Sequence, residues 1–215
     1  MKFLSKSKNR LLVNTLLVIA AAFLGLSCLI YFFPLSFIDL GISRKIQVHH
    51  NVTLDHFMAA ISLFGTMPYS AVTIGATALL FFIFKLRKEA LFTLLTALSG
   101  LVSSLVKLLI NRPRPAKDLV RIIEITREQS FPSGHTLFYT VFFGFLIIIM
   151  GNLKSVNYYF RISIIVLSSA MILLIPFSRI YLGAHWFTDV LGGALLGVLC
   201  LSVLGYFYLP KTETK

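Results

Sequence analysis

Three short stretches of this sequence carry the residue types that bind and transfer a phosphoryl group. The first runs from Lys107 to Pro115, the second is Pro132-Ser133-Gly134-His135, and the third runs from Ser178 to Asp189. Together they supply several cations, two histidines, a carboxylate and a glycine-containing turn. Cations and backbone N–H groups stabilise phosphate oxygens, and an imidazole can act as a nucleophile or an acid. The three stretches therefore predict a site for phosphoryl chemistry.

His185 and Asp189 are four residues apart, which on one helix would place them on the same face. The Asp189 carboxylate could then accept a hydrogen bond from one imidazole nitrogen and leave the other unprotonated. An imidazole held in this way is a competent nucleophile, as in a catalytic triad. The alternative is a polar pair that only satisfies two groups at a helix end. Because ionisable residues inside a span are costly and functional by default, we predict His185 as nucleophile and Asp189 as its orienting partner.

Ser133 and Gly134 directly precede an apolar run, so Ser133 is a natural N-cap for a helix. The first backbone N–H groups of that helix would then favour an anion. His135 lies in the first turn, and histidine's unperturbed pKa of about 6.5 suits a general acid near neutrality. The alternative is an ordinary capped helix with a histidine at the membrane interface.

Cations flank these groups in the first and third stretches. Lys107 lies near the end of an apolar run, where an unpaired ammonium is costly, and the prolines that follow are expected to turn Arg114 toward the pocket. Arg114 and Arg179 offer planar forks for phosphate oxygens, and Lys107 offers a point charge. Arg112 is a secondary candidate. The alternative is that Lys107 extends to the interface and Arg114 is a solvated loop charge.

The composition predicts that membrane-spanning helices position these stretches. Of 215 residues, 57% are hydrophobic and 13% charged, and the mean hydropathy is +0.87, which is more apolar than one water-facing core could hide. A spanning helix needs about 20 apolar residues. Six runs near that length occur, at residues 11–33, 66–84, 90–110, 136–150, 162–177 and 185–209. We therefore predict an all-α integral membrane bundle of six transmembrane helices, forming a single domain over residues 1–215.

The first run has two alternative interpretations. It follows four basic residues like a secretory signal peptide, but its apolar stretch exceeds the roughly 7–15 residues of such a signal. A lipoprotein-type cleavage before Cys28 is the other alternative, although Gly25 stands where leucine is expected. We interpret the run as a retained helix.

The connections are less regular than the spans. Residues 34–65 mix apolar and charged positions, and their second half has helical spacing, which predicts an interfacial segment along the membrane surface. The histidines of this connection have no partner at a ligand spacing and are read as interfacial residues. They are His49, His50 and His56. Residues 116–131 fit neither a helix nor a strand and receive no assignment.

Basic residues indicate the sidedness of the chain. An even number of spans puts both termini on one side, where Lys and Arg number eleven against nine on the other. Three of the nine, Lys107, Arg114 and Arg179, are assigned to phosphate, which leaves six. Because Lys and Arg concentrate on the cytoplasmic side, we predict cytoplasmic termini in the plasma membrane and the candidate site on the outer face.

The formal charge of +12 would suggest nucleic-acid binding in a soluble protein. Here the basic residues form short clusters between apolar runs, so we expect the lipid bilayer and no nucleic acid as partner. Cys28 and Cys200 lie inside apolar runs and are interpreted as packing residues, not as a disulfide or a metal pair. No pattern indicates an oligomeric state.

The three stretches match, in order, the motifs K-x6-RP, PSGH and SR-x5-H-x3-D of the type 2 phosphatidic acid phosphatase superfamily, which this chain resembles. Every motif position is present, and the motifs cover residues 107–189. The six predicted spans extend the resemblance over nearly the whole chain. The chain looks like the compact bacterial membrane branch, which includes phosphatidylglycerophosphate and undecaprenyl-pyrophosphate phosphatases.

The resemblance implies a covalent mechanism. His185 would attack phosphorus to give a phosphohistidine, Asp189 would orient it, His135 would protonate the leaving oxygen, and water would hydrolyse the intermediate. The residues implied to bind phosphate oxygens are Lys107, Arg114, Ser133, Gly134 and Arg179. The family needs no metal or other cofactor, which agrees with a sequence that lacks a carboxylate cluster for Mg²⁺.

The resulting prediction is a lipid phosphatase that hydrolyses the terminal phosphate of an amphiphilic phosphate or pyrophosphate. Phosphatidylglycerophosphate and undecaprenyl pyrophosphate are equal candidates as substrate, with phosphatidic acid behind them. One alternative is a lipid phosphotransferase, in which another lipid accepts the phosphoryl group. The other is a non-catalytic lipid-phosphate binder or transporter.

Overall fold

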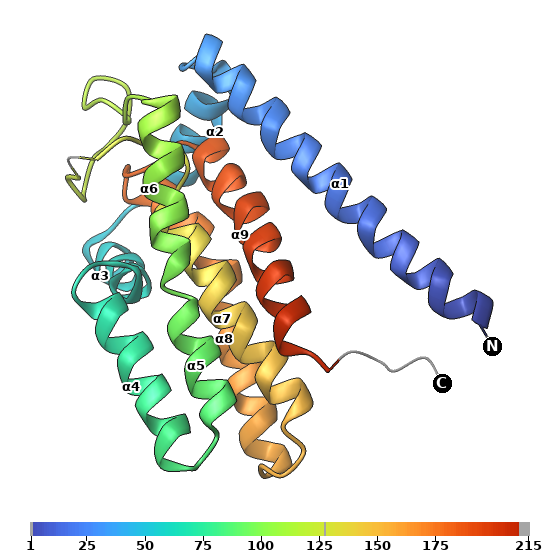
Figure 1. Ribbon diagram of the computed structural model, residues 1–215. Helices are drawn as coiled ribbons and strands as arrows, with labels where there is room; N and C mark the ends of the chain where they lie inside the picture. The colour runs from blue at the N-terminus through green and yellow to red at the C-terminus, as the bar shows by residue number, and fades with distance from the viewer. Residues whose placement is uncertain (1, 127, 211–215) are drawn as a thin grey trace.

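The computed structural model describes residues 2–126 and 128–210, which form helices and irregular connections without a strand. Three residues of the charge count, Arg127, Lys211 and Lys215, lie outside these ranges. The helices, shown in Figure 1, are α1 (Lys2–Phe32), α2 (Phe37–Gln47), α3 (Val52–Ser62), the 3-10 helix η1 (Leu63–Gly65), α4 (Tyr69–Ile83), α5 (Arg87–Leu95), α6 (Leu98–Ile110), α7 (Gly134–Asn152), α8 (Tyr158–Tyr181) and α9 (Phe187–Tyr208).

The predicted all-α membrane bundle is confirmed. Within the described ranges, five helical segments are long and apolar enough to cross a membrane: α1 from Arg10, α5 continued by α6, α7, α8 and α9. The pair formed by α3 with η1 and by α4 passes the same test together but is bent by 59°, so the number is six if this pair is one broken span. The second half of the 34–65 connection is thus a helix that leads directly into the next span.

Helix α7 is the central helix of the bundle and packs along both α8 and α9 (Figure 1). Two glycines of α9 allow this close approach. A Cβ at Gly193 would overlap the Ser133 carbonyl, and one at Gly197 would overlap the Thr140 side chain. Because lipid tails are as apolar as the helices, such close packing holds a membrane bundle together where the hydrophobic effect cannot. The N-terminus of α7, with the PSGH stretch, is therefore fixed against the start of α9.

Two helix boundaries differ from the predicted spans, and both affect the candidate site. Helix α8 continues past Pro176 to Tyr181, so Arg179 lies in its last turn. Proline is tolerated inside transmembrane helices because neighbouring groups satisfy the freed backbone. Helix α9 begins only at Phe187, so His185 lies in the turn before it. The expectation that His185 and Asp189 share one helix face is therefore wrong, although the turn still brings them together.

Candidate active site

His185 lies buried in the turn between α8 and α9, with 2% of its surface exposed. Its Nδ1 is 3.6 Å from Asp189 Oδ2, longer than a hydrogen bond, and its Nε2 is 3.3 Å from Arg114 Nη1. Because a guanidinium can only donate, we assign the lone pair to Nε2 and the proton to Nδ1. In this tautomer Nε2 can attack an electrophile held beside Arg114.

Electrostatics keep this imidazole neutral. Burial lowers the pKa of His185, and three cations lower the pKa further. They are Arg114, Arg179 and Lys107. A neutral imidazole is the form that an attack through Nε2 requires.

Asp189 lies at the third position of α9, fully buried and held by several donors. Its Oδ2 accepts hydrogen bonds from the Trp186 N–H at 2.8 Å and from the Ser130 hydroxyl, and its Oδ1 accepts from Arg112 Nη1 at 2.5 Å. Its backbone carbonyl accepts from the Ser133 N–H at 2.9 Å. These bonds fix the carboxylate beside His185 and join α9 to the PSGH stretch.

Arg112, a secondary candidate for phosphate binding, has a different role in the structure. Its Nη2 pairs with Asp39 of α2 at 2.6 Å, its Nη1 also bonds the Thr188 hydroxyl at 2.7 Å, and its Nε bonds the Pro34 carbonyl at 2.9 Å. Every nitrogen of the guanidinium is thus engaged by a group of the protein, and its two carboxylate partners are buried. The secondary assignment of Arg112 to phosphate has no support in this geometry, which instead makes it a residue that positions Asp189.

Ser133 caps α7, as predicted, because its Oγ accepts a hydrogen bond from the Thr136 N–H at 3.4 Å. Next to it, His135 directs its Nε2 to the Thr66 hydroxyl at 3.1 Å. Gly65 lies against the imidazole, so that a Cβ at this position would overlap the ring. The turn after η1 therefore fixes His135 at the start of α7.

Lys107 and Arg179 each pair with a glutamate of the irregular 111–133 connection. Lys107 Nζ lies 2.6 Å from Glu128 Oε2. Arg179 bonds both carboxylate oxygens of Glu124, at 2.6 and 3.1 Å, and also the Ser62 hydroxyl. The side chains of Lys107 and Arg179 are 8% and 0% exposed, whereas those of Glu128 and Glu124 are 75% and 27% exposed. Two buried cations are therefore matched by two more accessible carboxylates.

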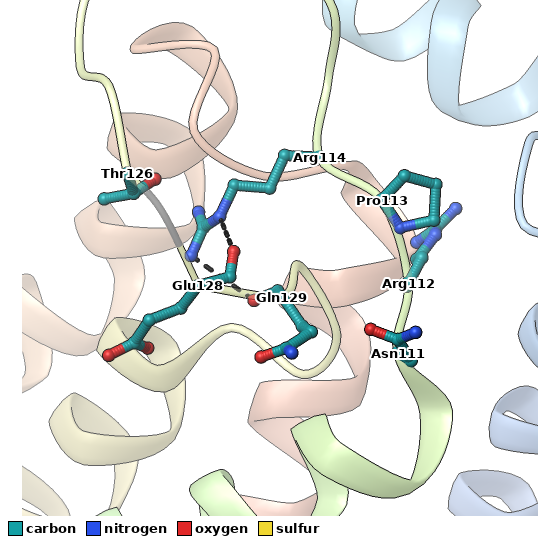
Figure 2. A pocket seen from close by; sticks show the side chains of 7 residues that line it. All are labelled: Asn111, Arg112, Pro113, Arg114, Thr126, Glu128 and Gln129. Carbon is teal, nitrogen blue, oxygen red and sulfur yellow. Dashed lines mark hydrogen bonds between the residues drawn. The ribbon is translucent and has the colours of Figure 1, made fainter.

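Arg114 lies at a hollow of about 450 Å³ in the same connection. Figure 2 shows its guanidinium reaching across this hollow to the segment that carries Glu128 and Gln129. Its Nε donates to the Glu128 carbonyl at 2.6 Å, its Nη2 to the Gln129 carbonyl at 3.3 Å, and its Nη1 to the Ala184 carbonyl at 2.6 Å. These acceptors are neutral. Burial lowers the pKa of Arg114 to about 10, so the guanidinium stays charged at neutral pH.

The structure thus brings the predicted residues to one end of the bundle, through contacts that run from α6 to the start of α9. Sequence reasoning missed several residues that complete the arrangement. They are Asp39, Ser62, Gly65, Thr66, Glu124, Glu128 and Ser130. None stands at a recognisable spacing from a motif. The one available signal was charge, since buried cations at a helix end need anions nearby.

Comparison with known families gives one match that covers more than half of the chain. The model of the PAP2 superfamily matches residues 88–213, a segment that contains all three motif stretches.

Curated relatives agree with this match. Phosphatidylglycerophosphatase B of Bacillus subtilis is 30% identical over 168 residues, which are 75% of this chain and 78% of the relative. Undecaprenyl-diphosphatase BcrC of the same organism is 29% identical over 164 residues, 70% of this chain and 73% of the relative. Lipid phosphate phosphatase delta of Arabidopsis thaliana is 29% identical over 171 residues. The chain spans only 39% of the length of this plant protein.

Two solved structures share the fold. A transmembrane PAP2-type phosphatidylglycerolphosphate phosphatase from Bacillus subtilis superposes with a TM-score of 0.77 at 24% identity, covering 93% of this chain and 98% of the other. LpxE from Aquifex aeolicus superposes with a TM-score of 0.62 at 23% identity, covering 79% and 95%. At these identities the structures support the fold alone.

Proposed function

The chain belongs to the PAP2 superfamily, and we propose that it is a membrane lipid phosphatase that removes the terminal phosphate of a lipid phosphate or pyrophosphate. One observation carries the proposal. The neutral His185 presents Nε2 to Arg114 at 3.3 Å while its Nδ1 faces the fixed Asp189 carboxylate. An electrophilic phosphorus held by the guanidinium would lie in reach of a nitrogen lone pair, which is the arrangement that nucleophilic catalysis needs.

The reaction proceeds in two steps. In the first, His185 Nε2 forms a bond to phosphorus, the bond from phosphorus to the leaving oxygen breaks, and His135 gives its proton to that oxygen. In the second, water gives a proton to His135 and attacks phosphorus, the bond from His185 Nε2 to phosphorus breaks, and inorganic phosphate is released. Asp189 stabilises the imidazolium that forms during the attack.

The phosphate oxygens are bound by the cations and by the start of α7. Lys107, Arg114 and Arg179 neutralise the charge that develops on the oxygens, and Ser133 and Gly134 present the first backbone N–H groups of the helix. Two buried atoms in the described part of the chain support this binding mode because they lack a hydrogen-bond partner. They are Arg179 Nε and Ser103 Oγ, the second of which lies beside Gly134.

The names of the relatives guide the choice of substrate. Bacillus subtilis contains one relative named for phosphatidylglycerophosphate and another named for undecaprenyl diphosphate, at nearly equal identity to this chain. Both compounds have a terminal phosphate on a lipid whose tail stays in the bilayer. We propose these two as the candidate substrates, ahead of phosphatidic acid.

The test is phosphate release by the detergent-purified protein in the presence of EDTA, on phosphatidylglycerophosphate, undecaprenyl pyrophosphate, phosphatidic acid and diacylglycerol pyrophosphate. We expect release from at least one of the first two. His185→Ala should reduce it by about 10³-fold or more, as expected when a nucleophile is removed. His56→Ala, at an exposed position of α3, is the matched control and should keep wild-type activity. Full activity of His185→Ala would rule out the phosphohistidine.

The site is proposed to face the outside of the plasma membrane, with both termini in the cytoplasm. A cysteine introduced as Lys117→Cys, at an exposed position of the 111–133 connection, should react with a membrane-impermeant maleimide in intact cells. Lys154→Cys, in the exposed connection between α7 and α8, is the matched control and should react only after permeabilisation. The reverse labelling pattern would invert the topology.

A further inference from the structure

Glu124 is held beside Arg179 by the backbone of the fold. The N–H groups of Ile123 and Glu124 both donate to the Leu182 carbonyl, at 2.9 and 3.2 Å. This contact requires Gly183, because its φ is +68° and because a Cβ there would overlap the Arg121 carbonyl. The loop is therefore docked onto the turn that carries His185, and the position of Glu124 follows from that docking.

Glu128 is anchored in the same way at its backbone. Its carbonyl accepts from Arg114 Nε at 2.6 Å while its carboxylate reaches Lys107. Figure 2 shows this division, with the Glu128 carboxylate directed away from the guanidinium of Arg114. The Lys107 ammonium lowers the pKa of Glu128, so the side chain is a carboxylate at neutral pH.

The two glutamates engage the same atoms that a phosphate group would use. Glu124 binds both terminal nitrogens of Arg179 through its two oxygens, as a phosphate binds an arginine fork. Glu128 engages the Nζ of Lys107. A phosphate group and these carboxylates therefore compete for one set of donors.

The charges show what this competition does. Lys107, Arg114 and Arg179 contribute +3, and the two glutamates contribute −2, so these five side chains sum to +1. A phosphate dianion that replaced both carboxylates would leave the same sum of +1. With neutral side chains in place of the glutamates, the dianion would enter a cluster of +3 and would bind far more tightly, as would the phosphate product.

We propose that Glu124 and Glu128 are internal ligands of the phosphate site, which hold its cations between turnovers and are displaced by the incoming phosphate group. This proposal rests on the proposed function. The carboxylates weaken the binding of substrate and of product by a similar factor, and their return to Lys107 and Arg179 speeds the release of inorganic phosphate. Displacement requires only side-chain rotation for Glu128, which is 75% exposed.

The experiment measures the affinity for inorganic phosphate, which needs no turnover. Wild type, Glu124→Gln and Glu128→Gln are titrated with phosphate in detergent, and binding is followed through the rise in Tm. We expect the half-saturating phosphate concentration to fall roughly tenfold in Glu124→Gln and roughly threefold in Glu128→Gln, in line with a charge-assisted pair that is partly buried and one that is exposed. KM for the lipid substrate should fall in the same order.

Two features keep the test specific. Asp118→Asn removes one negative charge from an exposed position of the same connection, and it should leave the phosphate affinity unchanged. Glutamine is isosteric with glutamate and retains the backbone bonds of both positions. If the two glutamates only hold the loop, their substitution should lower the phosphate affinity. If they are internal ligands, their substitution should raise it.

The outcomes separate the two proposals. Unchanged or weaker phosphate binding in both glutamine variants, with normal lipid hydrolysis by the wild type, would overturn the internal ligands and leave the lipid phosphatase standing. Tighter phosphate binding in the variants of a protein that hydrolyses no lipid of the panel would support the internal ligands and overturn the lipid phosphatase.

Discussion

Arg112 and Arg114 stand two residues apart in the same motif stretch, yet their charges are balanced in opposite ways. Arg112 pairs with two carboxylates on helices, Asp39 and Asp189, and all three side chains are at most 1% exposed. Arg114 donates to three carbonyl oxygens and faces the neutral His185. Its charge is left available to an anion.

The surroundings of the two arginines differ in the same way. Around Arg112 both members of each ion pair are buried, so water cannot replace either partner. Through Arg112, the two pairs link α2 to α9. Around Arg114 the neighbouring cations Lys107 and Arg179 are buried, but their glutamate partners are accessible. A cation whose partner can leave is suited to binding, whereas a cation whose partners cannot leave is suited to structure.

The largest effect is expected for the buried ion pairs of Arg112. Asp39→Ala would leave Arg112 buried with one carboxylate fewer, and we expect it to lower the free energy of unfolding by about 3–5 kcal/mol. Denaturant titration in detergent measures this loss. Asp118→Asn, an exposed acidic residue, is the matched control and should change stability by less than about 0.5 kcal/mol. If Asp39→Ala were as stable as the wild type, the distinction between the two arginines would be lost.

The features of the site that depend on residues close together in the sequence could be predicted. The end of the third span near Lys107, the N-cap Ser133 and the proximity of His185 to Asp189 all depend on residues within a few positions of each other. Apolar runs bounded by charge likewise give the spans, because a bilayer accepts only helices with few charges.

The remainder depends on residues that the chain brings together over long distances. Asp39 meets Arg112 across 73 positions, and Glu124 meets Arg179 across 55. No periodicity marks such pairs, and the 111–133 connection has no regular hydrogen bonding that could set a pattern. The apolar run continues through the turn at His185, so the span predicted from hydropathy begins two residues before α9.

A smaller effect is expected where the irregular connection docks on the turn. Gly183→Ala would place a Cβ at a φ of +68° and against the Arg121 carbonyl, which should displace the loop that carries Glu124. We expect a stability loss of about 1–2 kcal/mol, from the left-handed backbone, and a fall of about tenfold in kcat/KM, for which a misplacement of about 1 Å would suffice. Phosphate-release assays and denaturant titration measure the two changes.

Gly151→Ala is the matched control for this substitution. Gly151 lies in α7, and a Cβ built at this position would have no atom within 4 Å apart from its chain neighbours and its own helix backbone. Alanine there should be neutral or stabilising by up to about 1 kcal/mol, without a change in activity. Equal activity losses in both variants would show that the docking of the connection onto the turn has no special importance.

The smallest expected effect is a shift of the pH profile of kcat/KM, which reports the charge that Arg114 leaves available. Burial lowers the pKa of His185 and the Arg114 charge lowers it further, so protonation inactivates the nucleophile only below its ordinary pKa of about 6.5. Arg114→Gln removes this cation, so the acid limb should move to higher pH, by up to about one unit. Arg114→Lys keeps the charge and should keep the limb near its wild-type position, even where both variants lose overall activity. The same limb in all three proteins would mean that Arg114 does not act on His185. A wild-type profile that is flat between about pH 5 and 9 would count against two-histidine chemistry, in which His185 must be neutral while His135 is protonated.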